Sequence, residues 1–187
     1  AAGMLANMAT LLCGKTVVNL NFTASQESLC TAVKEAEIKT LYSSRRFLDK
    51  LAQKGIDLSL VLAQVKVVHL EDLKSGISKA EMLRLFLAVK LFPASWLQRL
   101  YCEPCDADQT AAILFSSGSE GAPKGVMLSH RNIMANLKQV ADVLNTEQSD
   151  VMMASLPLFH AFGLTVTQFM PLIEGMPVVC HADPTDA

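Results

Sequence analysis

One stretch of the sequence, from 111 to 126, most constrains what this chain can fold into. It begins with the apolar run Ala-Ala-Ile-Leu-Phe and continues Ser-Ser-Gly-Ser-Glu-Gly-Ala-Pro-Lys-Gly-Val. A short apolar run bounded by turn residues is typical of a buried strand. A flexible Ser/Gly linker is a poor explanation, because apolar strands flank the segment and Pro123-Lys124-Gly125 is too specific for a linker. The stretch therefore predicts a strand that opens into a structured loop.

The composition of this loop suits the binding of an anion. Three glycines can adopt positive φ and let the backbone approach an oxyanion closely. Successive N–H groups in such a loop can turn inward and form a concave anion site. Serine hydroxyls and one lysine ammonium add further donors. The residues concerned are Ser116, Ser117, Gly118, Ser119, Gly121, Lys124 and Gly125.

Two common phosphate-binding motifs do not fit the loop. A Walker A motif, G-x-x-x-x-G-K-[ST], counted from Gly118, needs Gly before Lys124 and Ser or Thr after it. The sequence has Pro123 and Gly125 at those positions. A dinucleotide-binding G-x-G-x-x-G motif needs a third glycine at a spacing that Gly118 and Gly121 do not provide.

The segment 115–126 resembles the signature loop of the adenylate-forming superfamily, which includes acyl-CoA synthetases, peptide-synthetase adenylation domains and luciferases. The shared pattern is S-G-[ST]-[ST]-G followed by x-P-K-G. The resemblance implies a loop that holds the β- and γ-phosphates of ATP, with Mg²⁺ as the second cofactor. The implied binding residues are Ser116, Ser117, Gly118, Ser119, Glu120, Gly121 and Lys124. Glu120 departs from the pattern, because a carboxylate repels phosphate unless it turns outward or meets Mg²⁺.

A second motif, at 156–163, reads Leu-Pro-Leu-Phe-His-Ala-Phe-Gly. It is similar to the superfamily's next motif, whose His or aromatic residue lines the acyl or aryl pocket. The substrate-binding residue implied is His160, although a histidine taken alone is more often structural. Within the superfamily, 115–187 most resembles the synthetase half of bifunctional acyl-[acyl-carrier-protein] synthetase / 2-acylglycerophosphoethanolamine acyltransferase enzymes.

That resemblance implies a ligase that activates a fatty acid as acyl-AMP and transfers it to acyl carrier protein. The activity would be linked to reacylation of 2-acylglycerophosphoethanolamine in phospholipid turnover, at the cytoplasmic face of the bacterial inner membrane. The alternative is a non-catalytic nucleotide-binding or membrane-docking module. An H-x-x-x-x-D pair, as an acyltransferase needs, occurs at His181 and Asp186. Because Pro184 lies between them, we interpret it as coincidence.

Several parts of the superfamily's machinery are not found in these 187 residues. They are an aromatic-Gly-x-Thr-Glu motif, an aspartate for the ribose hydroxyls and a lysine on a mobile C-terminal domain. The sequence also starts inside an apolar segment without an initiator Met. We therefore expect a soluble, inactive fragment of a longer enzyme, with no catalytic residue and no metal ligand of its own.

Helical and extended patterns alternate along the chain, which favours an α/β fold of mostly parallel sheets flanked by helices. We expect a first lobe over 1–105 and a phosphate-loop lobe over 106–187, joined by a polar linker. The expected strands are 16–20, 41–42, 65–70, 111–115, 151–154 and 176–180. Apart from a first helix at 4–13, the helices are expected to begin at capping patterns. These are Thr23 with Gln26, Ser44, Ser78 with Glu81, and Ser129.

The expected helix 78–92 is apolar around most of its circumference, and only Arg84 and Lys90 interrupt the run from Met82 onward. A core or inter-lobe helix is the common explanation of such a pattern. The alternative is an interfacial helix on a membrane, with membrane phospholipid as a partner of the segment 78–101. The aromatic residues at headgroup depth and the basic residues near anionic lipid would be Trp96, Tyr101, Arg84, Lys90 and Arg99.

Charge and cysteine usage narrow the function classes. The formal net charge is −2, from 16 basic and 18 acidic residues, so no basic excess points to a nucleic-acid partner. Five cysteines, an odd number in a chain of this length, argue against a disulfide framework. The C-x-x-C at Cys102 and Cys105 has no second pair that could complete a zinc site, and we interpret it as two ordinary thiols.

Overall fold

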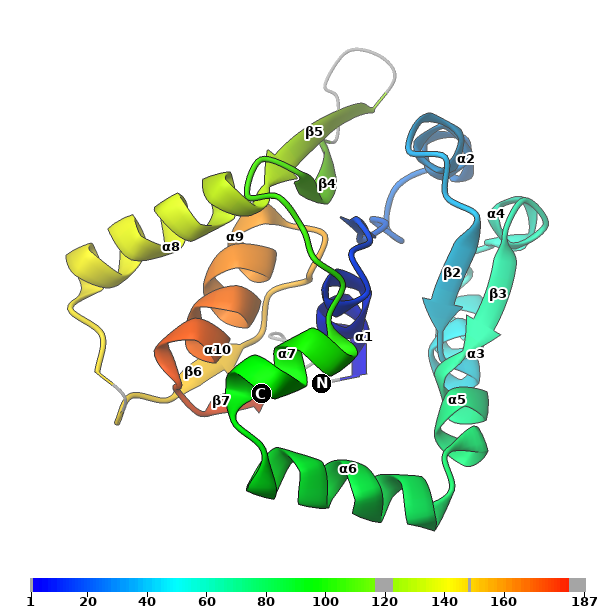
Figure 1. The fold of residues 1–187 in the computed structure, drawn as a ribbon. Coiled ribbons are helices and arrows are strands. Elements are labelled where there is room, and N and C mark those ends of the chain that lie inside the picture. The colour runs from blue at the N-terminus through cyan, green and yellow to red at the C-terminus, as the bar shows by residue number, and fades with distance from the viewer. Residues whose placement is uncertain (1, 117–122, 148, 182–187) are drawn as a thin grey trace.

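The computed structural model describes residues 2–116, 123–147 and 149–181, and it has the predicted α/β architecture (Figure 1). The first half comprises α1 Ala2–Leu12, β1 Val17–Val18, α2 Gln26–Glu35, β2 Thr40–Ser43, α3 Arg45–Gln53, α4 Ser59–Leu62, β3 Lys66–His69, α5 Leu70–Gly76, α6 Lys79–Leu91 and α7 Ala94–Tyr101. The second half comprises β4 Thr110–Ser116, β5 Lys124–Ser129, α8 His130–Leu144, β6 Met152–Ala154, α9 Ala161–Leu164, the π-helix η1 Thr165–Phe169, α10 Met170–Glu174 and β7 Val178–Cys180.

The strands form small sheets in which parallel pairing prevails, as predicted. β1 pairs with β4, β2 with β3, and β6 with β7, all parallel. β5 is antiparallel to β4, which makes the order of that sheet β1-β4-β5. Figure 1 shows β2, β3, α3 and α5 on one side and α8, α9, α10, β6 and β7 on the other, with α1 between them.

The main core lies where α8 and η1 pack beside the β1-β4-β5 sheet. Its buried side chains come from both ends of the sequence, so the early residues close the same core as the late ones. The core residues are Val17, Ala111, Ala112, Leu114, Ile133, Leu137, Leu164, Val166, Phe169, Met170 and Met176. A second, smaller cluster joins α2 to α4 through Leu29, Val33 and Val61.

Three of the predicted helix starts are confirmed. Ser44 accepts a hydrogen bond from the amide of Phe47 at the start of α3, at 3.1 Å. Ser78 forms a reciprocal capping box with Glu81, and Ser129 forms one with Asn132. Each cap satisfies amide groups that a helix leaves unpaired in its first turn.

The predicted capping box of Thr23 with Gln26 is wrong. Ser25 is the N-cap of α2, and its hydroxyl accepts from the amide of Ser28 at 3.2 Å. Thr23 instead donates from its amide and its hydroxyl to the side-chain oxygen of Asn21, at 3.1 and 2.6 Å. An Asn side chain two residues upstream competes for the Thr in this way and moves the helix start.

Of the two common explanations of 78–92, a helix buried in the core is wrong, and an inter-lobe helix stays a prediction. The helix exists over Lys79–Leu91 and ends before Pro93 as predicted, but Ala88 is its only buried residue. It runs along one edge of the molecule and joins α5 to α7 (Figure 1). No helix in the described ranges has both the length and the apolar character that a transmembrane span requires.

Candidate functional site

The predicted phosphate-binding stretch lies between two hydrogen-bonded strands. Phe115 is opposite Gly125, and Ser116 is opposite Lys124 in the last pair of the β4–β5 ladder. The Ser116 Oγ donates to the carbonyl oxygen of Lys124 across 3.5 Å. The chain therefore leaves β4 and enters β5 at neighbouring points, and β4 itself is held by its parallel pairing with β1.

Five of the seven predicted phosphate-binding residues lie outside the described residues: Ser117, Gly118, Ser119, Glu120 and Gly121. The other two, Ser116 and Lys124, are placed by the hairpin. Gly125 fits its position because the side chains of β4 lean over it. A Cβ on Gly125 would lie 3.2 Å from the Cγ2 of Ile113 and 3.2 Å from the Cε1 of Phe115.

The side chain of Lys124 is exposed. Among the residues that the structure places, the ion pairs are Arg45 with Asp72 and Arg131 with Asp108, each at 2.7 Å, and Lys124 belongs to neither. An ammonium group that is not engaged by a described carboxylate remains available for an external anion. An exposed lysine at the first position of β5 therefore suits an anion such as phosphate, to which Lys binds as a point charge.

A cavity of about 330 Å³ lies beside this hairpin, at the small end of the range for ligand sites. Most of its wall is apolar, and its polar groups come from widely separated parts of the chain. The lining residues are Asn21, Leu114, Phe115, Ser116, Val126, Leu128, Phe159, His160 and Ala161. The structure thus brings Ser116 and His160 to one cavity, while Lys124 does not line it.

His160 sits at the entrance to α9 as its N-terminal flanking residue. Its amide donates to the carbonyl of Pro157 at 3.1 Å, and its own carbonyl accepts from the amide of Leu164 at 2.9 Å. The imidazole packs against the ring of Phe159, with centroids 4.7 Å apart, and the residue is exposed. The backbone of His160 is therefore fixed while its ring remains accessible from the cavity.

Gly163 allows this turn to close. A Cβ at Gly163 would collide with the carbonyl oxygen of Pro157 and would lie 2.9 Å from its carbonyl carbon. The close approach holds α9 against the 156–160 turn. The π-helix η1 continues from α9, and π-helical turns occur often at functional sites.

A buried polar contact ties η1 to α1. The Nδ2 of Asn7 donates to the Oε1 of Gln168 at 2.8 Å, although 161 positions separate the two residues. Gln168 is fully buried, at 0% exposure. The sequence analysis did not find this pair, because nothing local in the sequence links an Asn in the first helix to a distant Gln.

Asn21 lines the cavity and Phe22 packs against Phe159 of its wall, and the sequence analysis predicted neither position. Phe22 packs edge-on against both Phe159 and Phe47, each with ring centroids 5.3 Å apart. Edge-to-face packing at this distance is a favourable aromatic geometry. The three rings connect α3 to the cavity wall, and no motif spacing in the sequence predicts the connection.

The arrangement puts a few polar groups beside a mostly apolar cavity. The hairpin offers a hydroxyl and an ammonium where its two strands meet, and the neighbouring cavity is mostly apolar. No group of three or more His, Cys, Asp or Glu side chains in the described part of the chain could hold a metal ion. Mg²⁺ usually binds through substrate phosphates and one or two carboxylates, so a protein cage is not required for it.

Comparison with known proteins finds one matching family and several similar relatives. The family model described as AMP-binding enzyme matches residues 1–187. The medium-chain fatty-acid–CoA ligase of Escherichia coli K12 is 46% identical over 68 residues, which are 36% of this chain and 12% of that protein. The chloroplastic long-chain-fatty-acid–[acyl-carrier-protein] ligase AEE15 of Arabidopsis thaliana is 42% identical over 57 residues, which are 30% of this chain and 8% of that protein.

Among solved structures, o-succinylbenzoate CoA synthetase (MenE) of Bacillus subtilis, in complex with its acyl-adenylate intermediate, has a TM-score of 0.73. It is 22% identical, and the match covers 97% of this chain and 40% of that chain. At this identity the likeness concerns the fold. The chain spans well under two thirds of the length of each of these relatives.

Proposed function

The chain belongs to the AMP-binding enzyme family, whose members form adenylates, and from this premise we propose that it carries the ATP-phosphate loop of a fatty-acid ligase. The observation that supports this most is the β4–β5 hairpin. It sets the Ser116 hydroxyl and the Lys124 residue opposite each other at the ends of the Ser/Gly segment. Ser116, at the end of β4, also lines the cavity that His160 lines.

In the proposed reaction the fatty-acid carboxylate attacks the α-phosphorus of ATP and pyrophosphate leaves. The protein has to position the reactants and neutralise charge on the leaving group. We propose that Lys124 and the segment 116–121 hold the β- and γ-phosphates. Mg²⁺, when bound, would share this neutralisation, and MenE of Bacillus subtilis has been solved with ATP and magnesium ion.

We propose that the acyl chain enters the cavity beside the hairpin. Leu114, Val126 and Leu128 give this cavity apolar walls, and His160 lies at its edge. The names of two relatives support a fatty acid as substrate, since one is a medium-chain fatty-acid ligase and the other a long-chain one. The hairpin would then hold the polar end of the reaction and the cavity the apolar end.

The thiol acceptor, the linked acyltransferase activity and the location are also proposals. We propose acyl carrier protein as the thiol acceptor, which is the acceptor named for the Arabidopsis relative. In the longer enzyme the ligase would be linked to reacylation of 2-acylglycerophosphoethanolamine by an acyltransferase, at the cytoplasmic face of the bacterial inner membrane. We also propose the division into lobes at 1–105 and 106–187, and we expect the 187-residue chain to be inactive alone.

Calorimetric titration with ATP–Mg²⁺ tests the proposal, with the protein at its natural length, wild type and Lys124→Ala. Lys138→Ala, on the exposed side of α8, is the matched control. A charged hydrogen bond contributes about 1.5–3 kcal/mol, so Lys124→Ala should weaken ATP roughly 10- to 100-fold while the control stays at the wild-type affinity. Equal affinities of the two variants would refute the proposed role of Lys124.

A second measurement addresses the isolated chain. Palmitate, ATP, Mg²⁺ and hydroxylamine are incubated with the 187-residue chain, and hydroxamate is measured. We expect none, because the sequence lacks three parts that adenylation requires in the family. Hydroxamate above the background without protein would contradict the expectation of an inactive chain.

A further inference from the structure

Asn21 is a polar residue of the cavity wall to which the proposed function gives no role. The proposed reaction brings a fatty-acid carboxylate into a cavity in which none of the described lining residues is Lys, Arg, Asp or Glu. A carboxylate in such surroundings needs hydrogen-bond donors. The polar side chains that line the cavity belong to Asn21, Ser116 and His160.

We propose that Asn21 binds the carboxylate of the fatty acid through its side-chain amide. This inference rests on the proposed function, because it takes the acyl substrate to occupy this cavity. It adds a binding residue that lies outside both sequence motifs, in the segment that joins β1 to α2 (Figure 1).

The register of the sheet places Asn21 and Ser116 at the same edge. β1 and β4 are parallel, with Val18 opposite Ile113. Asn21 and Ser116 each lie three residues beyond this pair, toward the carboxyl ends of the two strands. Ligands of open α/β sheets bind outside the carboxyl ends of the strands. Both residues therefore reach the cavity from neighbouring strand ends, and both line it.

Two hydrogen bonds fix the orientation of the Asn21 side chain. Its Oδ1 accepts from the amide of Thr23 at 3.1 Å and from the hydroxyl of Thr23 at 2.6 Å. A backbone N–H can only donate, so the atom that faces it has to be the side-chain oxygen of Asn21. The Nδ2 group, with its two hydrogens, is then the other branch of the amide. No described residue accepts a hydrogen bond from it.

The backbone around Asn21 is held as well. Its carbonyl oxygen accepts from the amide of Ala24 at 3.0 Å. The next residue, Phe22, packs edge-on against Phe47 and Phe159, with ring centroids 5.3 Å apart in each pair. A donor that is held in place in this way loses little conformational freedom when a ligand binds.

The other two polar groups of the wall have other contacts. The Ser116 Oγ donates to the carbonyl oxygen of Lys124 across 3.5 Å. The ring of His160 packs against that of Phe159, with centroids 4.7 Å apart. The amide of Asn21 can donate to the fatty-acid carboxylate and then to the carbonyl oxygen of the acyl-adenylate, because both are hydrogen-bond acceptors.

The variant Asn21→Asp separates substrate binding from the contact with Thr23. Aspartate keeps an oxygen that accepts from Thr23, but it replaces Nδ2 by a second carboxylate oxygen, which repels the substrate carboxylate. The assay is pyrophosphate release by the protein at its natural length, with decanoate or palmitate, whichever the wild type accepts better. Loss of a hydrogen bond to a charged group should raise the KM for the fatty acid roughly 10- to 100-fold. The affinity for ATP–Mg²⁺, measured by calorimetry, should fall far less.

The corresponding fatty amide, used as an inhibitor, provides a readout that a merely structural role would not change. Its N–H groups can donate to the introduced aspartate, whereas the fatty acid at neutral pH offers only acceptors. The ratio of the KM for the fatty acid to the inhibition constant of the amide should therefore be higher in Asn21→Asp than in the wild type.

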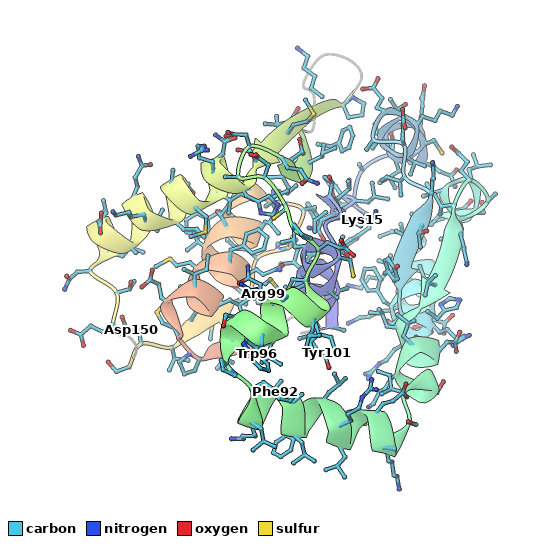
Figure 2. The ribbon with its side chains drawn as sticks, viewed as in Figure 1. Lys15, Phe92, Trp96, Arg99, Tyr101 and Asp150 are labelled. Atoms are coloured by element: carbon cyan, nitrogen blue, oxygen red, sulfur yellow. The ribbon has the colours of Figure 1, made fainter. Side chains whose placement is uncertain are left out.

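Asn145→Asp is the matched control for the change of charge. Asn145 is exposed and follows α8, which has 15 residues and begins directly after β5, so it lies about 22 Å from the start of that helix. Figure 2 shows Asp150, a little further along the chain, on the side of the molecule away from the β4–β5 hairpin. The control should keep the wild-type KM. Asn21→Ala should lose thermal stability as well as substrate affinity, whereas Asn21→Asp should keep the wild-type melting temperature.

Four results would overturn the proposal. An Asn21→Asp variant with the wild-type KM would reduce Asn21 to a partner of Thr23. An equal loss of ATP affinity would assign the amide to the nucleotide. A melting temperature of Asn21→Asp as low as that of Asn21→Ala would show that another part of the chain accepts from Nδ2. A wild type that releases no pyrophosphate with either acid would refute the proposed function and this inference with it, whereas the first three results, in an active wild type, refute this inference alone.

Discussion

Replacing Gly163 by alanine should destabilise the protein, although alanine is the better helix former. Gly163 lies in α9, and a Cβ there would collide with the Pro157 carbonyl oxygen. It would also lie 2.9 Å from the Pro157 carbonyl carbon and 3.2 Å from the carbonyl oxygen of Leu156. All three atoms are backbone atoms, so no side-chain rotation relieves the overlap.

The cost follows from what has to move. The Pro157 carbonyl accepts a hydrogen bond from the amide of His160, and η1 behind α9 is buried along its length. Overpacking of this kind costs about 1–3 kcal/mol, and we take the upper end because neither side is mobile. The gain in helix propensity from Gly to Ala is about 1 kcal/mol. The net expectation is a loss of about 2 kcal/mol of unfolding free energy.

Urea denaturation measures this loss, and Gly76→Ala is the matched control. Gly76 is also a helical glycine, at the end of α5, but a Cβ there meets nothing within 4 Å. The control should be neutral or gain about 0.4–1 kcal/mol. With a urea dependence of about 2 kcal/mol per molar, the Gly163→Ala midpoint should fall by about 1 M. A Gly163→Ala midpoint equal to or above that of Gly76→Ala would show that the turn yields and that the close approach has no energetic role.

Two other substitutions test long-range contacts. Asn7→Leu and Gln168→Leu should each cost about 1–3 kcal/mol of unfolding free energy, because each leaves a buried polar partner unsatisfied. The double variant should lose less than the sum of the two single losses. Strictly additive losses in a double-mutant cycle would show that the two side chains are not coupled. The hydrogen bond from Arg131 holds the pKa of Asp108 below its ordinary value of 3.8. A lowered pKa stabilises the folded state above the unfolded pKa, and this contribution is lost as the pH falls through the folded pKa. Unfolding measured from about pH 6 down to about pH 2 should therefore show a smaller loss of stability in Asp108→Asn than in the wild type, and parallel pH profiles would contradict the linkage.

The features that could be predicted from sequence are those with local causes. The caps at Ser44, Ser78 and Ser129 follow from a hydroxyl that reaches an amide three residues later. The strands that became β4 and β6 follow from short apolar runs between turn residues. The Thr23 cap failed for a local reason too, since Asn21 offers a competing acceptor.

The features that could not be predicted depend on contacts between distant segments. The pattern at 79–91 predicts a helix and its apolar character, but not which surface covers it. In the structure, α6 joins α5 to α7, and Ala88 is its only buried residue (Figure 1). Likewise, Gln168 has no sequence feature that marks it as fully buried, because its partner Asn7 belongs to the first helix.

The cavity is lined by residues of the two motifs and by residues from outside them. Ser116 and His160 come from those motifs, but Asn21 completes the wall from the first part of the chain. Phe22, next to Asn21, is held between Phe47 of α3 and Phe159 of the second motif. A change in Phe47 therefore reaches the cavity through two ring contacts without altering either motif. If the cavity holds the acyl chain and the loop holds the nucleotide, as we propose, such wall residues would discriminate among acyl groups, and chains with identical motifs would differ in the acids that they accept.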